Sequence, residues 1–168
     1  MTPARGRSVP RDRDDEGRAL NARPRDALGR PLPYGAKGVA RLEEGAVREP
    51  QETITMAADL FGQKLPFHAH EVFEDAWKSA PREWRDLWKG LAQLAVGITH
   101  AARGNRTGAA RLLIRAAEHL EMFAGTQPYT IDVDAVRAWA VRTAGELNES
   151  RDSGPRWLEP PALTRNLR

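Results

Sequence analysis

The sequence has no cysteine among its 168 residues. Disulfides, thiolate metal sites and cysteine nucleophiles are therefore excluded. The absence of cysteine also fits a cytoplasmic protein, and we expect that location for this chain.

Long apolar runs are also missing. The longest uncharged apolar run, residues 91–102, contains Gln93 and His100 and is shorter than the roughly 20 apolar residues of a membrane span. Residues 1–15 lack the apolar core of a signal peptide, and their acidic residues argue against a mitochondrial transit peptide. The sequence therefore predicts no membrane association.

A basic excess is absent from most of the chain. Residues 1–50 carry a net charge of +3, whereas residues 51–168 are neutral. A neutral domain lacks the electrostatic footprint of a nucleic-acid-binding protein. The arginine-rich tail can still contact phosphate weakly, but nucleic-acid binding is the weakest of the functions considered.

Alternating β-branched runs are missing as well, so no strand is predicted. We divide the chain into three parts. The first is an Arg/Pro/Gly-rich tail, residues 1–50, which we expect to be disordered or extended. Within it, residues 27–34 can lie along the domain surface. Residues 51–150 form a helical domain, and residues 151–168 form a tail that folds back through Trp157.

Helical periodicity begins near residue 52 and predicts an all-α domain, a compact bundle of about five helices. Short connections make neighbouring helices antiparallel. Prolines start two of the helices, and Asn105 and Asp132 cap two others. The expected helices cover residues 52–63, 66–80, 81–103, 106–124 and 132–149.

The third and fourth of these helices form a hairpin at the centre of the domain. The spacing of Gln93, Gly97, His100 and Ala109 is close to that of one tetratricopeptide hairpin. A solenoid needs about three such units, so we interpret this one as part of the bundle. His119, at the edge of the fourth helix, is assigned a packing role.

The second helix places two ionisable residues, His70 and Glu74, within its apolar arc. At about 100° per residue, His68 and Asp75 fall on the opposite arc and are expected to face solvent. Glu71 lies at the boundary between the two arcs. Gln93 and His100 share one side of the third helix, so we expect them to be at least partly buried.

Two interpretations of this polar cluster remain open. His70, Glu74 and His100 can bind a divalent metal such as Zn²⁺, Mn²⁺ or Fe²⁺, or act in acid–base catalysis, with Glu71 and Gln93 supporting them. Alternatively, the residues form a hydrogen-bonded network that fixes helix packing. No cofactor is established by the sequence.

The turn between the third and fourth helices is basic. Arg103, Asn105 and Arg106 lie at a helix N-terminus, where an anion can bind. The alternative is an ordinary pair of helix caps with flanking arginines.

These motifs together resemble the bacterial and archaeal family called domain of unknown function 309, in its longer, actinobacterial type. The resemblance covers roughly residues 55–125 and implies a compact all-helical domain without an established activity. Phe73 departs from the smaller residue typical of the family. The family's characteristic positions map onto His70, Glu71, Glu74, Trp77, Gln93, His100, Gly104 and Asn105.

The sequence favours a non-catalytic binding or interaction module over an enzyme, because small helical domains are more often binders. Its expected partner is an unidentified protein or a second copy of the chain. A metal or acid–base site at His70, Glu74 and His100 is the alternative.

Overall fold

The computed structural model describes residues 15–16 and 23–165. The regular secondary structure of its described residues is helical, with two isolated β-bridges and no strand, which confirms the predicted all-α class. The five α-helices are α1 (Pro50–Gly62), α2 (Pro66–Ser79), α3 (Arg85–Ala102), α4 (Arg106–Glu121) and α5 (Val133–Glu149). Two short 3₁₀ helices, η1 (Arg82–Trp84) and η2 (Pro128–Thr130), precede α3 and α5.

The helix boundaries follow the local chemistry of the chain. The Asn105 side chain accepts a hydrogen bond from Gly108 N at 2.9 Å, and that of Asp132 accepts one from Ala135 N at 3.1 Å, so both predicted caps are confirmed. One start is wrong: α3 begins at Arg85 rather than at Pro81, because the intervening residues form η1.

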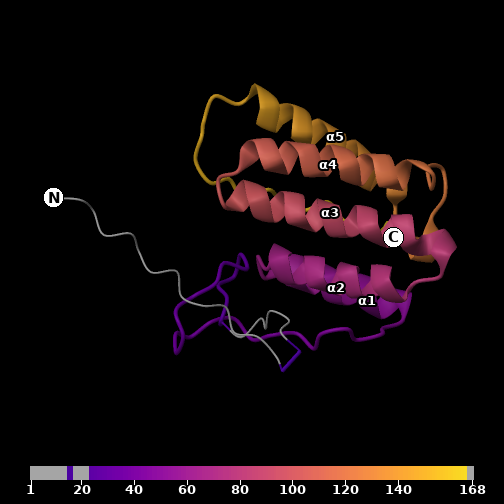
Figure 1. Cartoon of the computed structure of the whole chain (residues 1–168). Helices are drawn as coiled ribbons and strands as arrows, with labels where there is room; N and C mark the ends of the chain where they lie inside the picture. Colours follow the sequence, from indigo (N-terminus) through magenta and orange to yellow (C-terminus); the bar gives the residue numbers. More distant parts are fainter. Residues whose placement is uncertain (1–14, 17–22, 166–168) are drawn as a thin grey trace.

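The helices stack in chain order, and each packs mainly on its sequence neighbours, as Figure 1 shows. Helix α3 is covered by α2 on one side and by α4 on the other, which explains why it is apolar almost all round. Its fully buried leucines and Ile98 lie at the centre of a continuous core that also contains Phe73 and Leu113.

Helices α3 and α4 approach closely because glycines lie at their interface. A Cβ atom on Gly97 would lie 2.9 Å from Leu113 Cδ2, and one on Gly90 would lie 2.9 Å from Leu120 Cγ. The structure therefore has an antiparallel hairpin where the sequence predicted one. His119 Nδ1 also joins the two helices, because it lies 2.9 Å from Asp86 Oδ1.

Residues 23–49, called the N-terminal segment below, contain no helix and lie along α2 (Figure 1). The segment is folded by its own backbone: Leu32 N donates to Pro24 O, and Val39 N donates to Arg25 O. The Asp26 carboxylate accepts bonds from the backbone N–H groups of Leu28 and Arg30. The rest of the predicted tail, residues 1–14 and 17–22, lies outside the described residues.

The C-terminal segment, residues 151–165, returns along the helices. Leu158 and Leu163 are its buried residues, and Asp132 N donates to Leu163 O. Trp157, the expected anchor, is only half-buried and donates from Nε1 to Glu159.

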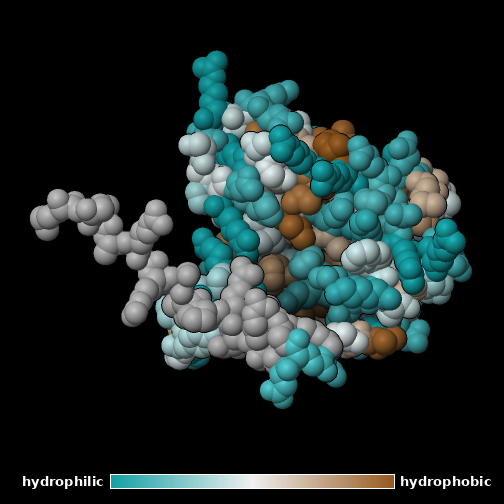
Figure 2. All heavy atoms as spheres, viewed as in Figure 1, coloured by the Kyte–Doolittle hydropathy of each residue, from teal (hydrophilic) through white to brown (hydrophobic). Residues whose placement is uncertain are grey.

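The surface of the domain is mixed. In Figure 2 the visible face is largely hydrophilic, with apolar patches exposed between the polar side chains. None of the helices in the described ranges combines the length and apolar composition that a membrane span requires.

Candidate functional site

His70 and Glu74 form the pair that the sequence predicted. His70 Nε2 lies 3.2 Å from Glu74 Oε2, and Lys78 Nζ lies 2.8 Å from Glu74 Oε1. The glutamate is therefore held between residues one helical turn before and after it. Burial lowers the pKa of His70, although the Glu74 carboxylate opposes this effect.

Gln93 lies on α3, which packs on α2. Two contacts with α2 flank it in the sequence: Lys89 Nζ lies 5.4 Å from the centre of the Trp77 ring, and Cζ of Arg103, which follows α3, lies 6.0 Å from that of Phe67. Gln93 is partly buried, as expected. Its Oε1 and His70 Nδ1 are buried without a hydrogen-bond partner in the structure.

His100 does not join His70 and Glu74. Its Nδ1 lies 2.8 Å from Asn105 Nδ2, so the imidazole supports the cap of α4. In the described part of the chain, no three His, Cys, Asp or Glu side chains form a group that could hold a metal ion. The described residues therefore do not bring His70, Glu74 and His100 together as a metal site. An acid–base role for His70 and Glu74 stays a prediction.

The basic turn between α3 and α4 is occupied by contacts within the chain. The Arg103 guanidinium donates to Leu28 O, at 2.9 Å from Nε, and thereby holds the N-terminal segment. Arg106 donates to Ser150 Oγ at 2.6 Å and to Gly154 O at 3.3 Å. Asn105 serves as the α4 cap. These contacts favour the capping interpretation of the turn over anion binding.

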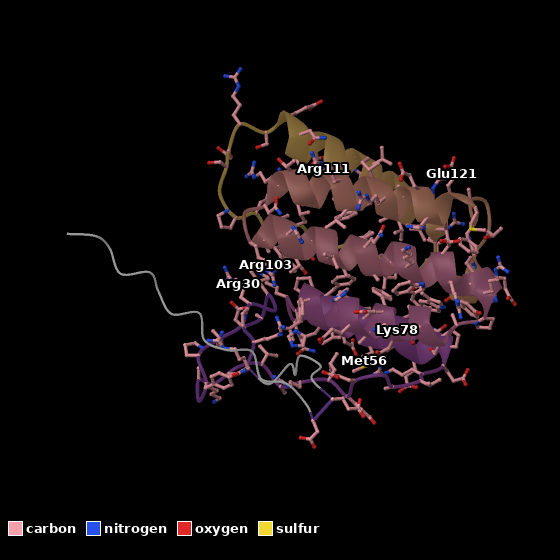
Figure 3. The ribbon with its side chains drawn as sticks, viewed as in Figure 1. Arg30, Met56, Lys78, Arg103, Arg111 and Glu121 are labelled. Carbon is pink, nitrogen blue, oxygen red and sulfur yellow. The ribbon has the colours of Figure 1, made fainter. Side chains whose placement is uncertain are left out.

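The main concavity of functional interest lies between the N-terminal segment and α2. Its volume is about 450 Å³, within the range of small-molecule sites. In Figure 3, Arg30 of the segment lies beside Arg103 at one end of α2, and Lys78 lies farther along that helix. The cavity is lined by Arg25, Val39, Arg41, Leu42, Glu43, Glu44 and Gly45 of the segment and by Phe67, His68, Glu71, Glu74, Asp75 and Lys78 of α2.

Two residues expected in solvent, His68 and Asp75, are part of this cavity wall. His68 is only 4% exposed, and its Nδ1 is buried without a hydrogen-bond partner. Asp75 accepts a bond from Gly45 N at 3.1 Å and pairs with Arg48 at 3.3 Å. The prediction is wrong because the N-terminal segment covers the polar arc of α2, and a helical wheel cannot show such a cover.

The aromatic ring of Phe67 fixes the segment over the start of α2. Arg25 Cζ lies 5.4 Å from its centre, and a Cβ atom on Gly29 would lie only 2.2 Å from Phe67 Cγ. Gly29 also has a positive φ of 74°, which favours glycine. The close contact therefore depends on this glycine.

The pKa of the Glu71 carboxyl in the cavity wall is raised. Burial raises its pKa, the nearby Arg25 lowers it, and the like charges of Glu44, Asp75 and Glu74 raise it further. Burial also lowers the pKa of His68. A partly desolvated carboxylate and a neutral imidazole therefore share one cavity, an arrangement that is enriched at functional sites.

The fold and this cavity define a small all-helical domain with a polar site under its N-terminal segment. Comparison with protein families gives the domain a name: residues 54–112 match the family called domain of unknown function DUF309, so the chain contains a DUF309 domain. This domain includes all of α2 and α3 and the first residues of α4.

The uncharacterized protein YpuF of Bacillus subtilis (strain 168) is 32% identical over 73 residues. The aligned stretch covers 43% of this chain and 42% of YpuF, so the chain spans less than half of that relative. No solved structure matches the chain. The similarity therefore identifies the family of the domain but does not assign an activity to it.

Proposed function

We propose that the protein is a non-catalytic binding module that recognises its ligand in the cavity between the N-terminal segment and α2. The observation that carries this proposal is the cavity itself, with a volume of about 450 Å³ and the buried, unpartnered His68 Nδ1 in its wall. Ligand sites combine such a concave space with a few placed polar groups.

The neighbouring polar residues support the site rather than form it. Glu74 is engaged by His70 and Lys78, so its carboxylate is already compensated on both sides. We propose that this pair has a structural role on α2, and that Gln93, whose Oε1 has no hydrogen-bond partner, does not extend it into a network. Buried polar groups commonly have this role.

Whether the protein also binds another macromolecule stays a prediction. Self-association and an unidentified protein partner are compatible with the helical stack. Nucleic acid is not proposed, because residues 51–168 are neutral.

The proposal can be tested by filling the cavity. Val39→Trp places a large side chain in the cavity wall, whereas Val47→Trp changes a residue of the same segment that is 80% exposed and does not line the cavity. Saturation-transfer NMR on the full chain would use a mixture of small cationic, anionic and neutral probe molecules. We expect at least one probe to bind wild type and Val47→Trp but not Val39→Trp.

Two outcomes would overturn the proposal. One is the absence of binding by every probe to the wild-type chain. The other is equal binding by the two tryptophan variants, which would place the binding site elsewhere.

A further inference from the structure

The cavity walls carry more negative than positive side chains. Five carboxylates face two arginines and one lysine. The positive groups also have partners of their own: Lys78 pairs with Glu74, and Arg41 donates to Arg23 O at 2.6 Å. The cavity thus presents an excess of negative charge to a bound molecule.

Three of the carboxylates are available to a ligand. Asp75 is engaged by Arg48, and Glu74 by Lys78 and His70. Across the described ranges, no hydrogen bond or ion pair is made by the side chains of Glu43, Glu44 or Glu71. Arg25 lies close enough to act on Glu71 electrostatically, but the surrounding glutamates and Asp75 act on it in the opposite sense.

His68 supplies an independent indication of the kind of ligand. The residue is 4% exposed, lines the cavity and keeps Nδ1 buried without a hydrogen-bond partner. A neutral imidazole has one acceptor nitrogen, and an unsatisfied buried acceptor is unfavourable. His68 and Glu71 are three residues apart on one helix, so their side chains lie on the same face. Both residues line the cavity.

We infer that the cavity binds a small organic cation with N–H donors, an ammonium or guanidinium group, that pairs with Glu71 and donates a hydrogen bond to His68 Nδ1. An anion would be repelled by the net negative charge of the cavity walls, and a neutral molecule would add no positive charge beside Glu71. This inference rests on the proposed binding function and specifies its ligand class.

Isothermal titration calorimetry on the full chain at pH 7.5 and low salt can test the inference. The probes are agmatine, which carries both a guanidinium and an ammonium group, n-butylamine, tetramethylammonium and acetate. n-Butylamine carries an ammonium group alone, so its comparison with agmatine shows what the guanidinium group and its second positive charge add to binding. Tetramethylammonium has the same charge as n-butylamine but no N–H donor, so it isolates the contribution of hydrogen bonding.

Glu71→Gln is the diagnostic variant, and Glu118→Gln on α4 is its matched control. Glu118 is exposed and does not line the cavity. We expect at least one N–H cation to bind wild type and Glu118→Gln alike. Glu71→Gln should weaken binding about tenfold or more, as expected for losing a hydrogen-bonded charge.

The outcomes separate this inference from the proposed function. Binding of acetate in preference to the cations would overturn the inference while supporting a binding cavity. Tetramethylammonium binding as tightly as n-butylamine would also overturn it, as would unchanged affinity in Glu71→Gln. Failure of all four probes, together with failure of the wider mixture above, would overturn both.

Discussion

The ionised Glu71 side chain is expected to destabilise the fold while serving in the proposed ligand site. Its carboxylate is partly desolvated and lies among like charges, so its pKa is raised in the folded state. A raised carboxyl pKa means that the folded state binds more protons than the unfolded state between the two pKa values. The ionised Glu71 side chain therefore lowers the free energy of unfolding at neutral pH.

Glu71→Gln should accordingly raise the melting temperature at pH 7. A rise of about 2 °C corresponds to a gain of roughly 1 kcal/mol in a chain of this size. The gain should vanish below the ordinary value of 4.5, where the wild-type side chain is protonated in both states. Thermal melts followed by circular dichroism at pH 7 and pH 4 measure it. A lower melting temperature at pH 7 would show that the charge stabilises the fold.

His68, which is buried, and His70, which is partly buried, give stability the opposite dependence on pH. Burial lowers the pKa of both His68 and His70 below 6.5, so the unfolded state gains protons first on acidification. These residues make their full contribution to the free energy of unfolding above pH 6.5. That contribution is lost as the pH falls below 6.5. Each unit of pH in that window costs up to about 1.4 kcal/mol per histidine.

Urea unfolding at pH 7.5 and pH 5.5 measures this loss. We expect the free energy of unfolding to fall over this interval in wild type and to fall less in His68→Gln. Equal losses in the two proteins would contradict the assignment of part of the effect to His68.

Single residues also show where sequence reasoning succeeded and where it stopped. His70 and Glu74 are paired as predicted, because residues four apart on a helix are neighbours whatever surrounds them. His100 was wrongly grouped with them because its partner, Asn105, lies beyond the helix end in the following turn. His68 and Asp75 were misplaced because their cover comes from residues far away in the sequence.

Among the elements, the N-terminal segment gives the sharpest test. Gly29 and Gly35 both have positive φ angles, 74° and 82°, so alanine is similarly strained at either position. Only at Gly29 would the added Cβ overlap the Phe67 ring, since nothing lies within 4 Å at Gly35. Gly29→Ala should therefore release the segment from α2, whereas Gly35→Ala should leave it docked.

Limited trypsin digestion reports this release, because the segment is rich in arginine. We expect cleavage between residues 23 and 48 to be several-fold faster in Gly29→Ala than in Gly35→Ala, while the helical content of the two remains the same. Equal cleavage of both variants would mean that the contact with Phe67 does not hold the segment.

The α3–α4 hairpin depends on glycine in a different way. A side chain on Gly90 would press on Leu120 and would lie 3.2 Å from Ala116 O, whereas a Cβ on Gly145 in α5 meets open space. Gly90→Val should lower the free energy of unfolding by about 1–3 kcal/mol through overpacking. Gly145→Ala should raise it by roughly 0.5–1 kcal/mol through helix propensity.

Chemical denaturation of both variants measures these changes. A Gly90→Val protein as stable as wild type would show that α3 and α4 can separate without loss. A destabilised Gly145→Ala protein would contradict the open surroundings of that position.

The helices themselves were predictable because their periodicity, prolines and caps act locally. The start of α3 was missed because a proline can begin a 3₁₀ turn as readily as an α-helix, and η1 fills the difference. The sequence allowed residues 27–34 to lie along the domain surface, but it could not place the N-terminal segment on α2, because the segment has no periodic pattern. Its position depends on Phe67, Asp75 and Arg103, which become neighbours only in the folded domain.

At the scale of the whole molecule, the helices form a layered stack and the segment closes one side of it (Figure 1). The part of the chain that matches DUF309, residues 54–112, supplies only the α2 wall of the cavity. The opposite wall comes from residues 25–45, which precede the matched region. Ligand recognition is therefore proposed to require both the matched region and the segment that precedes it.

Two-dimensional ¹H–¹⁵N NMR of the full chain titrated with agmatine tests this two-walled site most directly. We expect saturable shifts confined to amides of residues 25–45 and of α2, with little change in α4 and α5. Shifts confined to α2, spread over α4 and α5, or absent altogether would contradict a cation site formed by both walls.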